Sequence, residues 1–185
     1  GNMRRRLRRG GLPRFFMTSD TPSVEFQDWM DGYWAKDVQE LFRVERRASF
    51  QKFAELVFAQ SGGIFEATRF ARPAEISRPT VSNYLSVLEA TKVAHVIRPF
   101  SQRRSNEIVA APKVYAFDTG FVWHFWGRDE FRAEDAGRLF EHYVLNELNS
   151  RLAGAAVMYW RDKQGHEVDF VLPIRRDAPT CVECK

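Results

Sequence analysis

Residues 76–90, ISRPTVSNYLSVLEA, carry the strongest secondary-structure pattern in the chain. Ser77 is a preferred helix N-cap, and Pro79 suits the first helical turn, because its missing N–H would have no intrahelical partner there. Apolar side chains then recur at positions i, i+3, i+4 and i+7, which are Val81, Tyr84, Leu85 and Leu88. This spacing predicts an amphipathic helix over residues 78–90 with one buried face.

The segments around this helix predict a winged helix-turn-helix over residues 64–117. A shorter helical segment, IFEATRFA, precedes the helix, and two β-rich runs, KVAHVIRPF and KVYAFD, follow it on either side of the polar segment SQRRSNEIVAAP. Helix, turn, helix and hairpin in this order are typical of that fold. Further upstream, apolar spacing and aromatic residues predict two more helices, over residues 24–42 and 48–60.

In a winged helix, the second helix presents its polar face to the DNA major groove, and the hairpin tip contacts the backbone or minor groove. Hydroxyl and amide side chains can bond base edges, and arginines can pair with phosphates. The candidate DNA-contacting residues are Arg78, Thr80, Ser82 and Asn83 on the helix, and Arg103 and Arg104 at the hairpin tip. Winged helices also serve as protein–protein modules, so both functions stay open.

The positive charge of the chain is concentrated near its N-terminus. The formal net charge is +4, and five arginines lie in MRRRLRR (3–9), without which the charge would be −1. We therefore expect residues 1–14 to form a basic junction or tail, either a solvated arm or a phosphate-binding segment. Any DNA binding is expected to be mostly non-specific and to depend on this arginine run.

Other sequence features narrow the class of protein. No apolar stretch approaches the ~20 residues of a membrane span, and a secretory signal pattern is missing, so we expect a cytoplasmic protein. No G-x-x-x-x-G-K-[ST] motif occurs, so ATP binding is not expected in this chain. Cys181 and Cys184 form a single C-x-x-C without a second pair of zinc ligands, and we interpret them as reduced strand cysteines.

Acidic residues follow a regular pattern near the C-terminus. In a strand over HEVDFVL (166–172), Glu167 and Asp169 would share one face, and Phe170 with its apolar neighbours would face the core. The same alternation would place Glu183 and Lys185 side by side on a further strand. Two acids and a lysine could then meet, either around a divalent metal and a water or in a solvated salt bridge.

A carboxylate also lies on the apolar face of a helix expected from about residue 134. Gly137, Glu141, Val144 and Leu148 share that face. An unpartnered buried carboxylate costs several kcal/mol, so Glu141 requires a cation, a metal or a solvent-exposed rim. Arg161 and Lys185 are the candidate partners.

The order Glu141, Asp169 and Glu183-x-Lys185 resembles the PD-(D/E)-x-K nuclease superfamily. The resemblance implies that Asp169 and Glu183 hold Mg²⁺, that Lys185 orients or deprotonates the attacking water, and that Glu141 adds a supporting carboxylate. Hard carboxylate oxygens are the ligands that Mg²⁺ prefers, and a nearby lysine suits activation of a water.

A wider resemblance covers nearly the whole chain. Its motifs are GGLP, YWAKDV, ISRPTVSNYLSVLEA, PKVYAFDTG, GRLFEHYVLNEL, YWRDKQGHEVDFVL and the terminal ECK. Together they resemble the C-terminal half of predicted bacterial and archaeal AAA+ superfamily ATPases, in which an N-terminal ATPase precedes a domain of unknown function. The resemblance implies a winged helix followed by a nuclease-like segment, with an upstream ATPase domain or another protein subunit as partner.

The expected fold class is α+β, a winged helix-turn-helix followed by a truncated restriction-endonuclease-like α/β segment. After the basic tail, residues 15–117 would form a helical leader and the winged helix, and residues 118–185 a nuclease-like segment that is incomplete at its C-terminus. The expected function is a DNA-binding and effector module without turnover in this form. The alternatives are a metal-dependent nuclease, and a protein-interaction module whose contact surface is formed by the aromatic residues around Trp29, Tyr33 and Trp34, or by Trp123 and Trp126.

Overall fold

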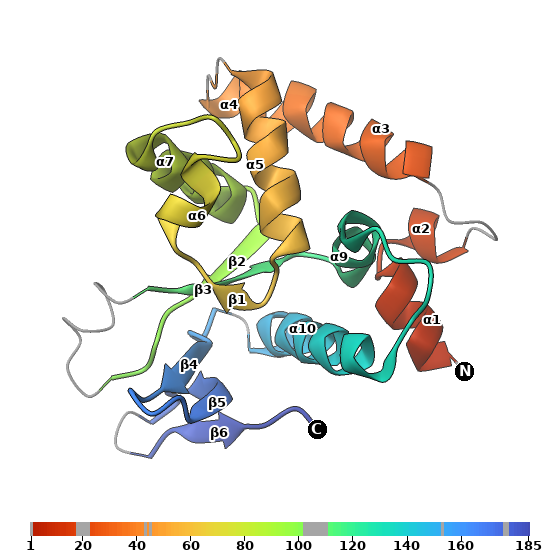
Figure 1. Cartoon of the computed structure of the whole chain (residues 1–185). Coiled ribbons are helices and arrows are strands. Elements are labelled where there is room, and N and C mark those ends of the chain that lie inside the picture. The colour runs from red at the N-terminus through yellow and green to blue at the C-terminus, as the bar shows by residue number, and fades with distance from the viewer. Residues whose placement is uncertain are drawn as a thin grey trace.

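The protein is described here by a computed structural model, which covers residues 2–17, 23–42, 44, 46–101, 111–152, 154–175 and 178–185. These residues form an α+β fold with two three-stranded antiparallel sheets (Figure 1). The helices are α1 (Asn2–Arg9), α2 (Pro13–Met17), α3 (Ser23–Tyr33), the π-helix η1 (Trp34–Val38), α4 (Gln39–Phe42), α5 (Arg47–Ala59), α6 (Ala67–Ala71), α7 (Arg78–Ala90), α9 (Thr119–Trp126) and α10 (Ala133–Arg151). The strands are β1 (Gly63–Ile64), β2 (Ala94–Ile97), β3 (Lys113–Ala116), β4 (Met158–Arg161), β5 (Glu167–Leu172) and β6 (Thr180–Val182).

Helix α7 confirms the prediction for residues 78–90. The Ser77 hydroxyl accepts a hydrogen bond from the backbone N–H of Thr80 at 3.3 Å, which satisfies one of the free donors of the first turn. Val81 and Leu88 are fully buried, as the spacing predicts. Leu85 is only partly buried, and Val87 lies in the core instead, so the buried face is rotated slightly from the predicted one.

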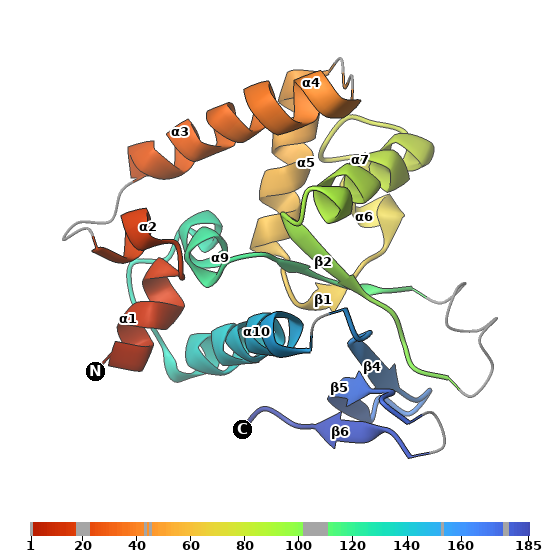
Figure 2. The same cartoon turned by 180° about the vertical axis from the view of Figure 1, so that it is seen from behind.

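The first sheet has the strand order β1-β3-β2, with β3 in the middle. Helices α5, α6 and α7 lie on one side of this sheet and α10 lies on the other, as both views show (Figures 1 and 2). The second sheet has the order β4-β5-β6 and lies below α10 in Figure 1. Helix α10 therefore has a core on each side.

The larger core consists mainly of aromatic side chains from the helices. Phe121 of α9 is fully buried and makes edge-on contacts with the rings of Phe15 and Phe26, at centroid distances of 5.5 and 4.7 Å. Tryptophan and tyrosine residues that were candidates for a contact surface pack in or against this core, namely Trp29, Tyr33, Trp34, Trp123 and Trp126. Helix α9, which the sequence-based division placed with the nuclease-like segment, thus packs with the N-terminal helices.

A smaller core lies between the first sheet, α10 and the second sheet. It contains Tyr115 of β3, Leu145 of α10, and Phe170 and Leu172 of β5. Because one face of the first sheet contributes to it, the two sheets are joined by apolar packing. No helix in the described ranges is both long enough and apolar enough to cross a membrane.

The N-terminal arginine run is an ordered part of the fold, so the expectation of a solvated arm was wrong. Leu7 is buried, and the backbone N–H of Gly11 donates to the Asp118 carboxylate at 2.6 Å. Arginine side chains of α1 stack on aromatic rings of their own chain, in the pairs Arg4–Phe131, Arg5–Phe16, Arg6–Tyr143 and Arg8–Trp123. Guanidinium groups bind to ring faces and their stems cover apolar surface, so a basic run can pack as a helix.

Candidate functional site

Five side chains from three elements meet between the first sheet, α10 and the second sheet, and we call them the Lys113 cluster. They are Lys113 and Tyr115 of β3, Glu141 of α10, and Glu167 and Asp169 of β5. The Tyr115 hydroxyl donates to Glu141 Oε1 at 2.5 Å. Lys113 Nζ forms a close ion pair with Glu167 and lies 3.6 Å from Glu141 Oε1.

The lysine is the most buried charged group of the cluster. The Lys113 side chain is 5% exposed, whereas those of Glu141 and Glu167 are 22% and 28% exposed. An ammonium group removed from water to this degree requires carboxylate partners to stay charged. The two glutamates supply that compensation from separate elements.

A β-bulge in β5 aims Asp169 at this cluster. The pairing register of β4 and β5 shifts by one residue, so that Asp169 and Phe170 both lie opposite Tyr159. Such a bulge interrupts the two-residue alternation of a strand. Phe170 packs near the Tyr115 ring, at a centroid distance of 6.1 Å, and the Asp169 charge acts on the same tyrosine and on Glu141. The prediction that Asp169 and Phe170 occupy opposite faces is therefore wrong.

Burial and like charges set the protonation of the cluster. Burial raises the pKa of Glu141, and the neighbouring charges of Asp169 and Glu167 raise it further, against the opposing effects of the Tyr115 hydrogen bond and the Lys113 charge. Burial and the Glu141 charge also raise the pKa of the Tyr115 hydroxyl far above its ordinary value. Tyr115 therefore remains a protonated donor.

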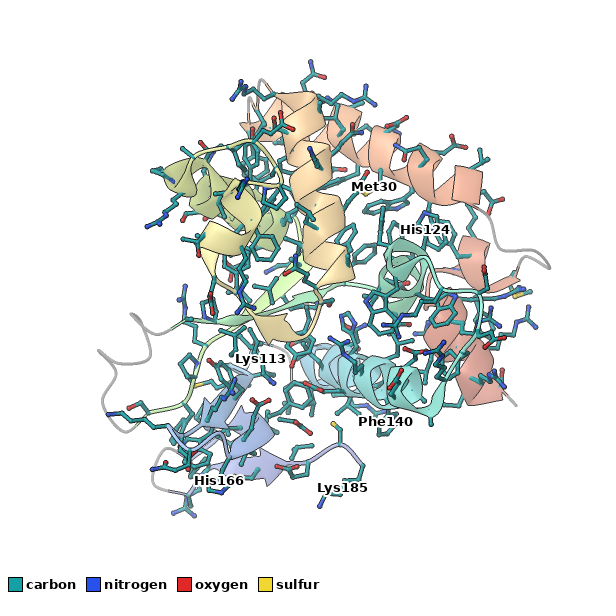
Figure 3. All side chains as sticks on the ribbon, in the orientation of Figure 1. Met30, Lys113, His124, Phe140, His166 and Lys185 are labelled. Carbon is teal, nitrogen blue, oxygen red and sulfur yellow. The ribbon has the colours of Figure 1, made fainter. Side chains whose placement is uncertain are left out.

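The C-terminal residues predicted to complete the site behave differently. Strand β6 ends at Val182, so Glu183 and Lys185 lie beyond it rather than on it, and both are exposed. Figure 3 shows Lys185 at the free end of the chain, well apart from Lys113. The structure thus brings together Glu141 and Asp169, and it places Lys113 where Lys185 was expected.

The backbone of the last residues is nevertheless tied to the cluster. The N–H of Cys184 donates to Asp169 Oδ2 at 2.8 Å. Burial, followed by the charges of Asp169, Glu141 and Glu183, raises the pKa of the Cys184 thiol to about 12. A thiol with this pKa stays protonated at neutral pH.

The alternative partner predicted for Glu141, Arg161, also lies elsewhere. Arg161 Nε is 3.9 Å from Glu167 and contributes to the rim of the cluster. One signal in the sequence could have indicated Lys113 instead. Lys113 and Tyr115 stand two positions apart in the predicted strand KVYAFD, and this spacing puts both side chains on one face.

These carboxylates do not form a ready site for Mg²⁺. Asp169 accepts from Cys184 N–H, Glu141 accepts from Tyr115, and Glu167 is bound to Lys113. Among the residues that the structure describes, no three His, Cys, Asp or Glu side chains are arranged to hold a metal ion. The predicted metal pair of Asp169 and Glu183 does not fit a bound divalent cation in this arrangement.

The predicted DNA-contacting residues of α7 lie mainly at the surface. Arg78, Ser82 and Asn83 are exposed. The Ser82 hydroxyl donates within its own helix to the carbonyl of Arg78 at 3.4 Å. Thr80 is half-buried, and its hydroxyl is 2.8 Å from that of Ser77, so it forms part of the helix cap. Arg103 and Arg104 lie outside the described residues.

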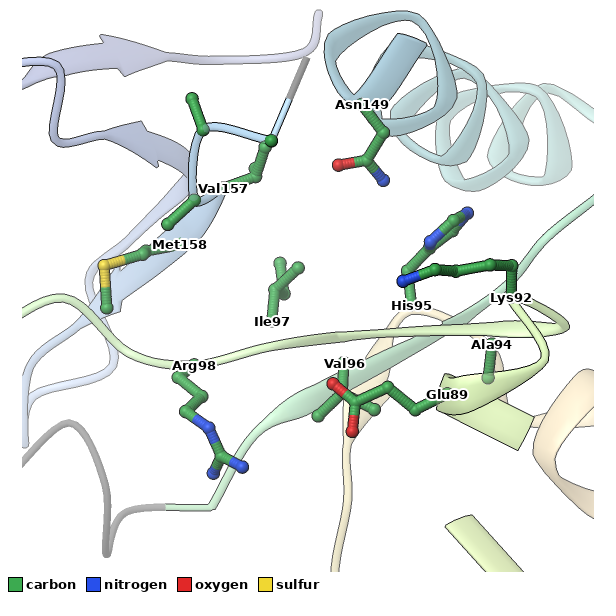
Figure 4. Close-up of a pocket in the computed structure, with 13 residues that line it drawn as sticks. Glu89, Lys92, Ala94, His95, Val96, Ile97, Arg98, Asn149, Val157 and Met158 are labelled. Carbon is green, nitrogen blue, oxygen red and sulfur yellow. The ribbon is translucent and has the colours of Figure 1, made fainter. Parts of the chain in front are cut away.

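A cavity of about 470 Å³ lies beside the outer edge of β2, between this strand, α10 and the start of β4. Figure 4 shows His95 and Asn149 on one side of β2, and Glu89 and Arg98 on the other. Burial, followed by the charge of Lys92, lowers the pKa of His95, so its imidazole is neutral at neutral pH. The charged side chains around this cavity are of both signs, namely Glu89, Lys92 and Arg98.

Comparison with known proteins gives the family of the chain. Residues 1–132 match the family described as "Domain of unknown function (DUF8612)", and residues 136–185 match the one described as "Domain of unknown function (DUF4143)". Because the first match covers most of its length, the chain belongs to the DUF8612 family. The DUF4143 domain is commonly an AAA-associated C-terminal domain.

Two curated relatives are longer than this chain. They are uncharacterized proteins of Mycobacterium bovis and Mycobacterium tuberculosis, each 26% identical over 174 residues, which is 90% of this chain and 39% of the relative. The chain thus spans about two fifths of the length of these relatives. No solved structure matches it significantly.

The boundary between the two family matches crosses the Lys113 cluster. Lys113 and Tyr115 belong to the DUF8612 segment, whereas Glu141, Glu167 and Asp169 belong to the DUF4143 segment. The cluster is therefore a polar contact between the two family segments.

Proposed function

We propose that this chain is a DNA-binding and effector module from the C-terminal part of a larger AAA+ ATPase, and that it acts without turning over DNA in this form. The observation that carries this proposal is the exposed polar face of α7. This helix lies on the first sheet, whose strand β3 contacts the DUF4143 segment through Lys113 and Tyr115. The length of the curated relatives and the common association of DUF4143 with AAA proteins support the larger context.

The DNA-binding part rests on the arrangement of residues 47–116. The elements follow the order α5, β1, α6, α7, β2, β3, and the sheet order is β1-β3-β2. This arrangement supports a winged helix in which α7 is the recognition helix. Arg78 and Asn83 point to solvent from α7, and arginine and asparagine are residues that read guanine and adenine edges or bind phosphates.

The effector part rests on the second segment. Helix α10 followed by an antiparallel sheet, with Glu141 on the helix and Asp169 on the middle strand, supports a nuclease-like fold. Its carboxylates are compensated by Lys113 rather than free to bind a cation. We infer that this segment is a scaffold without catalytic turnover, and that β3 links its conformation to that of the winged helix.

Fluorescence anisotropy with a labelled duplex tests the DNA-binding part. We expect Arg78→Ala and Asn83→Ala each to weaken binding by about tenfold, which corresponds to the 1–3 kcal/mol typical of one base or phosphate contact. The matched control is Arg151→Ala, which removes an exposed arginine of α10 that pairs with Glu147. Equal affinities of all three variants and the wild type would overturn this role of α7 and would favour the protein-interaction alternative.

A second candidate function is metal-dependent cleavage of DNA. One observation favours it, namely that the carboxylates of Glu141, Glu167 and Asp169 come together. A plasmid-nicking assay in Mg²⁺ or Mn²⁺ tests it, with Asp169→Ala as the variant. We expect no cleavage by the wild type; metal-dependent cleavage that Asp169→Ala abolishes would establish the nuclease instead.

A further inference from the structure

We propose that the end of the β4–β5 hairpin is a second nucleic-acid contact, in which Trp160 stacks on an unpaired base and Arg161 and Lys163 bind the flanking phosphates. The ligand class is single-stranded DNA. This inference rests on the proposed DNA-binding function, but it concerns a surface separate from α7.

Trp160 is exposed, unlike the other tryptophans of the chain. The remaining four pack in or against the larger core, whereas Trp160 is 36% exposed. Its place in β4 is fixed, because it pairs with Val168 of β5. The preceding residue, Tyr159, donates its backbone N–H to the Arg98 carbonyl at 3.1 Å and accepts that of Phe100 at 2.6 Å. The indole is therefore presented by a strand that is bonded on both edges.

The surface beside the indole is positive. Trp160 lines a shallow hollow of about 560 Å³, and the described residues around it include two cations, Arg161 and Lys163, and one carboxylate, Asp162. The Asp162 oxygens accept from the backbone N–H and the ring Nδ1 of His166, at 2.9 and 2.7 Å, so this carboxylate is engaged in the hairpin turn. Lys163 is exposed, and Arg161 keeps 48% of its side chain exposed. The two cations are thus accessible to an anionic ligand.

An exposed tryptophan beside cations fits a single strand better than other partners. A base inside a duplex is already stacked on both faces, whereas an unpaired base can stack on an indole, and basic side chains then follow the phosphates. The centre of a protein–protein interface is depleted of lysine and aspartate, but here such residues follow the indole directly in the sequence. Stacking is possible for every base, so we expect little sequence preference.

The position of the hairpin agrees with this role. Helix α7 and the second sheet lie on the same side of the molecule, and α1 lies on the opposite side in both views (Figures 1 and 2). Pro99, which follows β2, and Ala111, which precedes β3, line the hollow together with Trp160. Figure 3 shows His166, in the hairpin turn, on this side of the second sheet. A strand that leaves a duplex on α7 can therefore pass the ends of β2 and β3 to reach Trp160.

Fluorescence anisotropy with a short labelled oligothymidine tests the proposal, and a blunt duplex serves as the reference ligand. We expect the wild type to bind the oligothymidine and Trp160→Ala to bind it about tenfold more weakly. Trp160→Phe should keep most of the affinity, because a phenyl ring still stacks. Lys163→Gln should flatten the salt dependence of single-strand binding, because fewer phosphates are neutralised. Blunt-duplex affinity should stay unchanged in all three variants.

Two matched controls come from the helical part of the chain. Phe42→Ala removes an aromatic side chain of similar exposure, 39%, from α4, and Lys36→Gln removes an exposed lysine of η1. Both should bind the oligothymidine as the wild type does. A wild type that leaves the oligothymidine unbound, or a Trp160→Ala protein that binds it equally well, would overturn the proposal.

Two other outcomes are separable from these. If circular dichroism shows that Trp160→Ala does not fold, Lys163→Gln decides, and an unchanged salt dependence overturns the proposal. A dimer that depends on Trp160, seen by sedimentation without any oligothymidine binding, would overturn it in favour of a contact with a second copy of the chain. Loss of the α7 proposal in the blunt-duplex assay would leave the single-strand result as it is.

Discussion

Tyr115→Phe removes a single hydroxyl group from the Lys113 cluster and leaves the ring packing in place. The residue is 1% exposed, and its hydroxyl donates to the Glu141 carboxylate at 2.5 Å. A hydrogen bond to a charged acceptor contributes about 1.5–3 kcal/mol. Because Glu141 is 22% exposed, water can replace part of this bond, and we expect a loss near 2 kcal/mol in the free energy of unfolding, or about 4–8 °C in Tm. The pKa of Glu141 should rise further, since the lost bond favours the charged form.

Urea unfolding followed by circular dichroism measures this loss, and a double-mutant cycle with Glu141→Gln assigns it to the pair. We expect a coupling energy of about 1–2 kcal/mol. The matched control is Tyr33→Phe, which removes a hydroxyl in the larger core that forms a hydrogen bond with the Thr91 hydroxyl at 2.7 Å. The free-energy changes of Tyr33→Phe and Glu141→Gln should be additive. Additivity of Tyr115→Phe with Glu141→Gln would refute the claim that this bond joins the two segments.

Three more outcomes follow from the structure. Leu88→Ala should lower the free energy of unfolding by about 2–5 kcal/mol, measured with urea, and Leu85→Ala should lower it less, because Leu88 is fully buried and Leu85 is not. Equal losses would contradict the observed orientation of α7. Burial lowers the pKa of His142 to about 4, so as the pH falls the unfolded chain takes up a proton at this residue before the folded chain does. The stability that is present above pH 6.5 should therefore fall by about 3 kcal/mol toward pH 4. An equally steep fall in the His142→Gln variant would argue against His142 as the cause. The double variant Arg4→Gln/Arg5→Gln removes two exposed charges of α1 and keeps the buried Leu7 in place. It should weaken non-specific binding to a DNA duplex and make that binding less dependent on salt, because fewer phosphates are neutralised. An unchanged salt dependence would exclude α1 from the DNA-binding surface.

The sequence predicted those elements whose local pattern agrees with their environment. The limits of α7 follow from the Ser77 cap and the apolar spacing, and α5 and α10 begin within a residue or two of their predicted starts. Helix α9 was missed, because its residues are apolar on nearly all sides and show no periodicity. Its start could have been found at Asp118, whose carboxylate caps the N–H of Gly120.

The site could be predicted only in part. The need of Glu141 for a partner follows from its place on an apolar face, but the identity of that partner depends on tertiary structure. Lys113 is 28 residues from Glu141 and 54 from Glu167 in the chain, and no local pattern connects such distant residues. The bulge at Asp169 was equally hidden, because a strand pattern assumes regular alternation, and an extra residue reverses the face of everything beyond it.

The family boundary near residue 132 does not coincide with a boundary in the packing. Helix α10 starts just after it and buries Leu139 in the larger core and Leu145 in the smaller one. At its first turn the fully buried Asp135 pairs with Arg128 and accepts the backbone N–H of Arg132 at 2.9 Å, both from the preceding segment. Separating the chain just before α10 would leave the Asp135 carboxylate without these partners and expose apolar surface on α10, so we expect residues 133–185 to be less stable alone than in the whole chain.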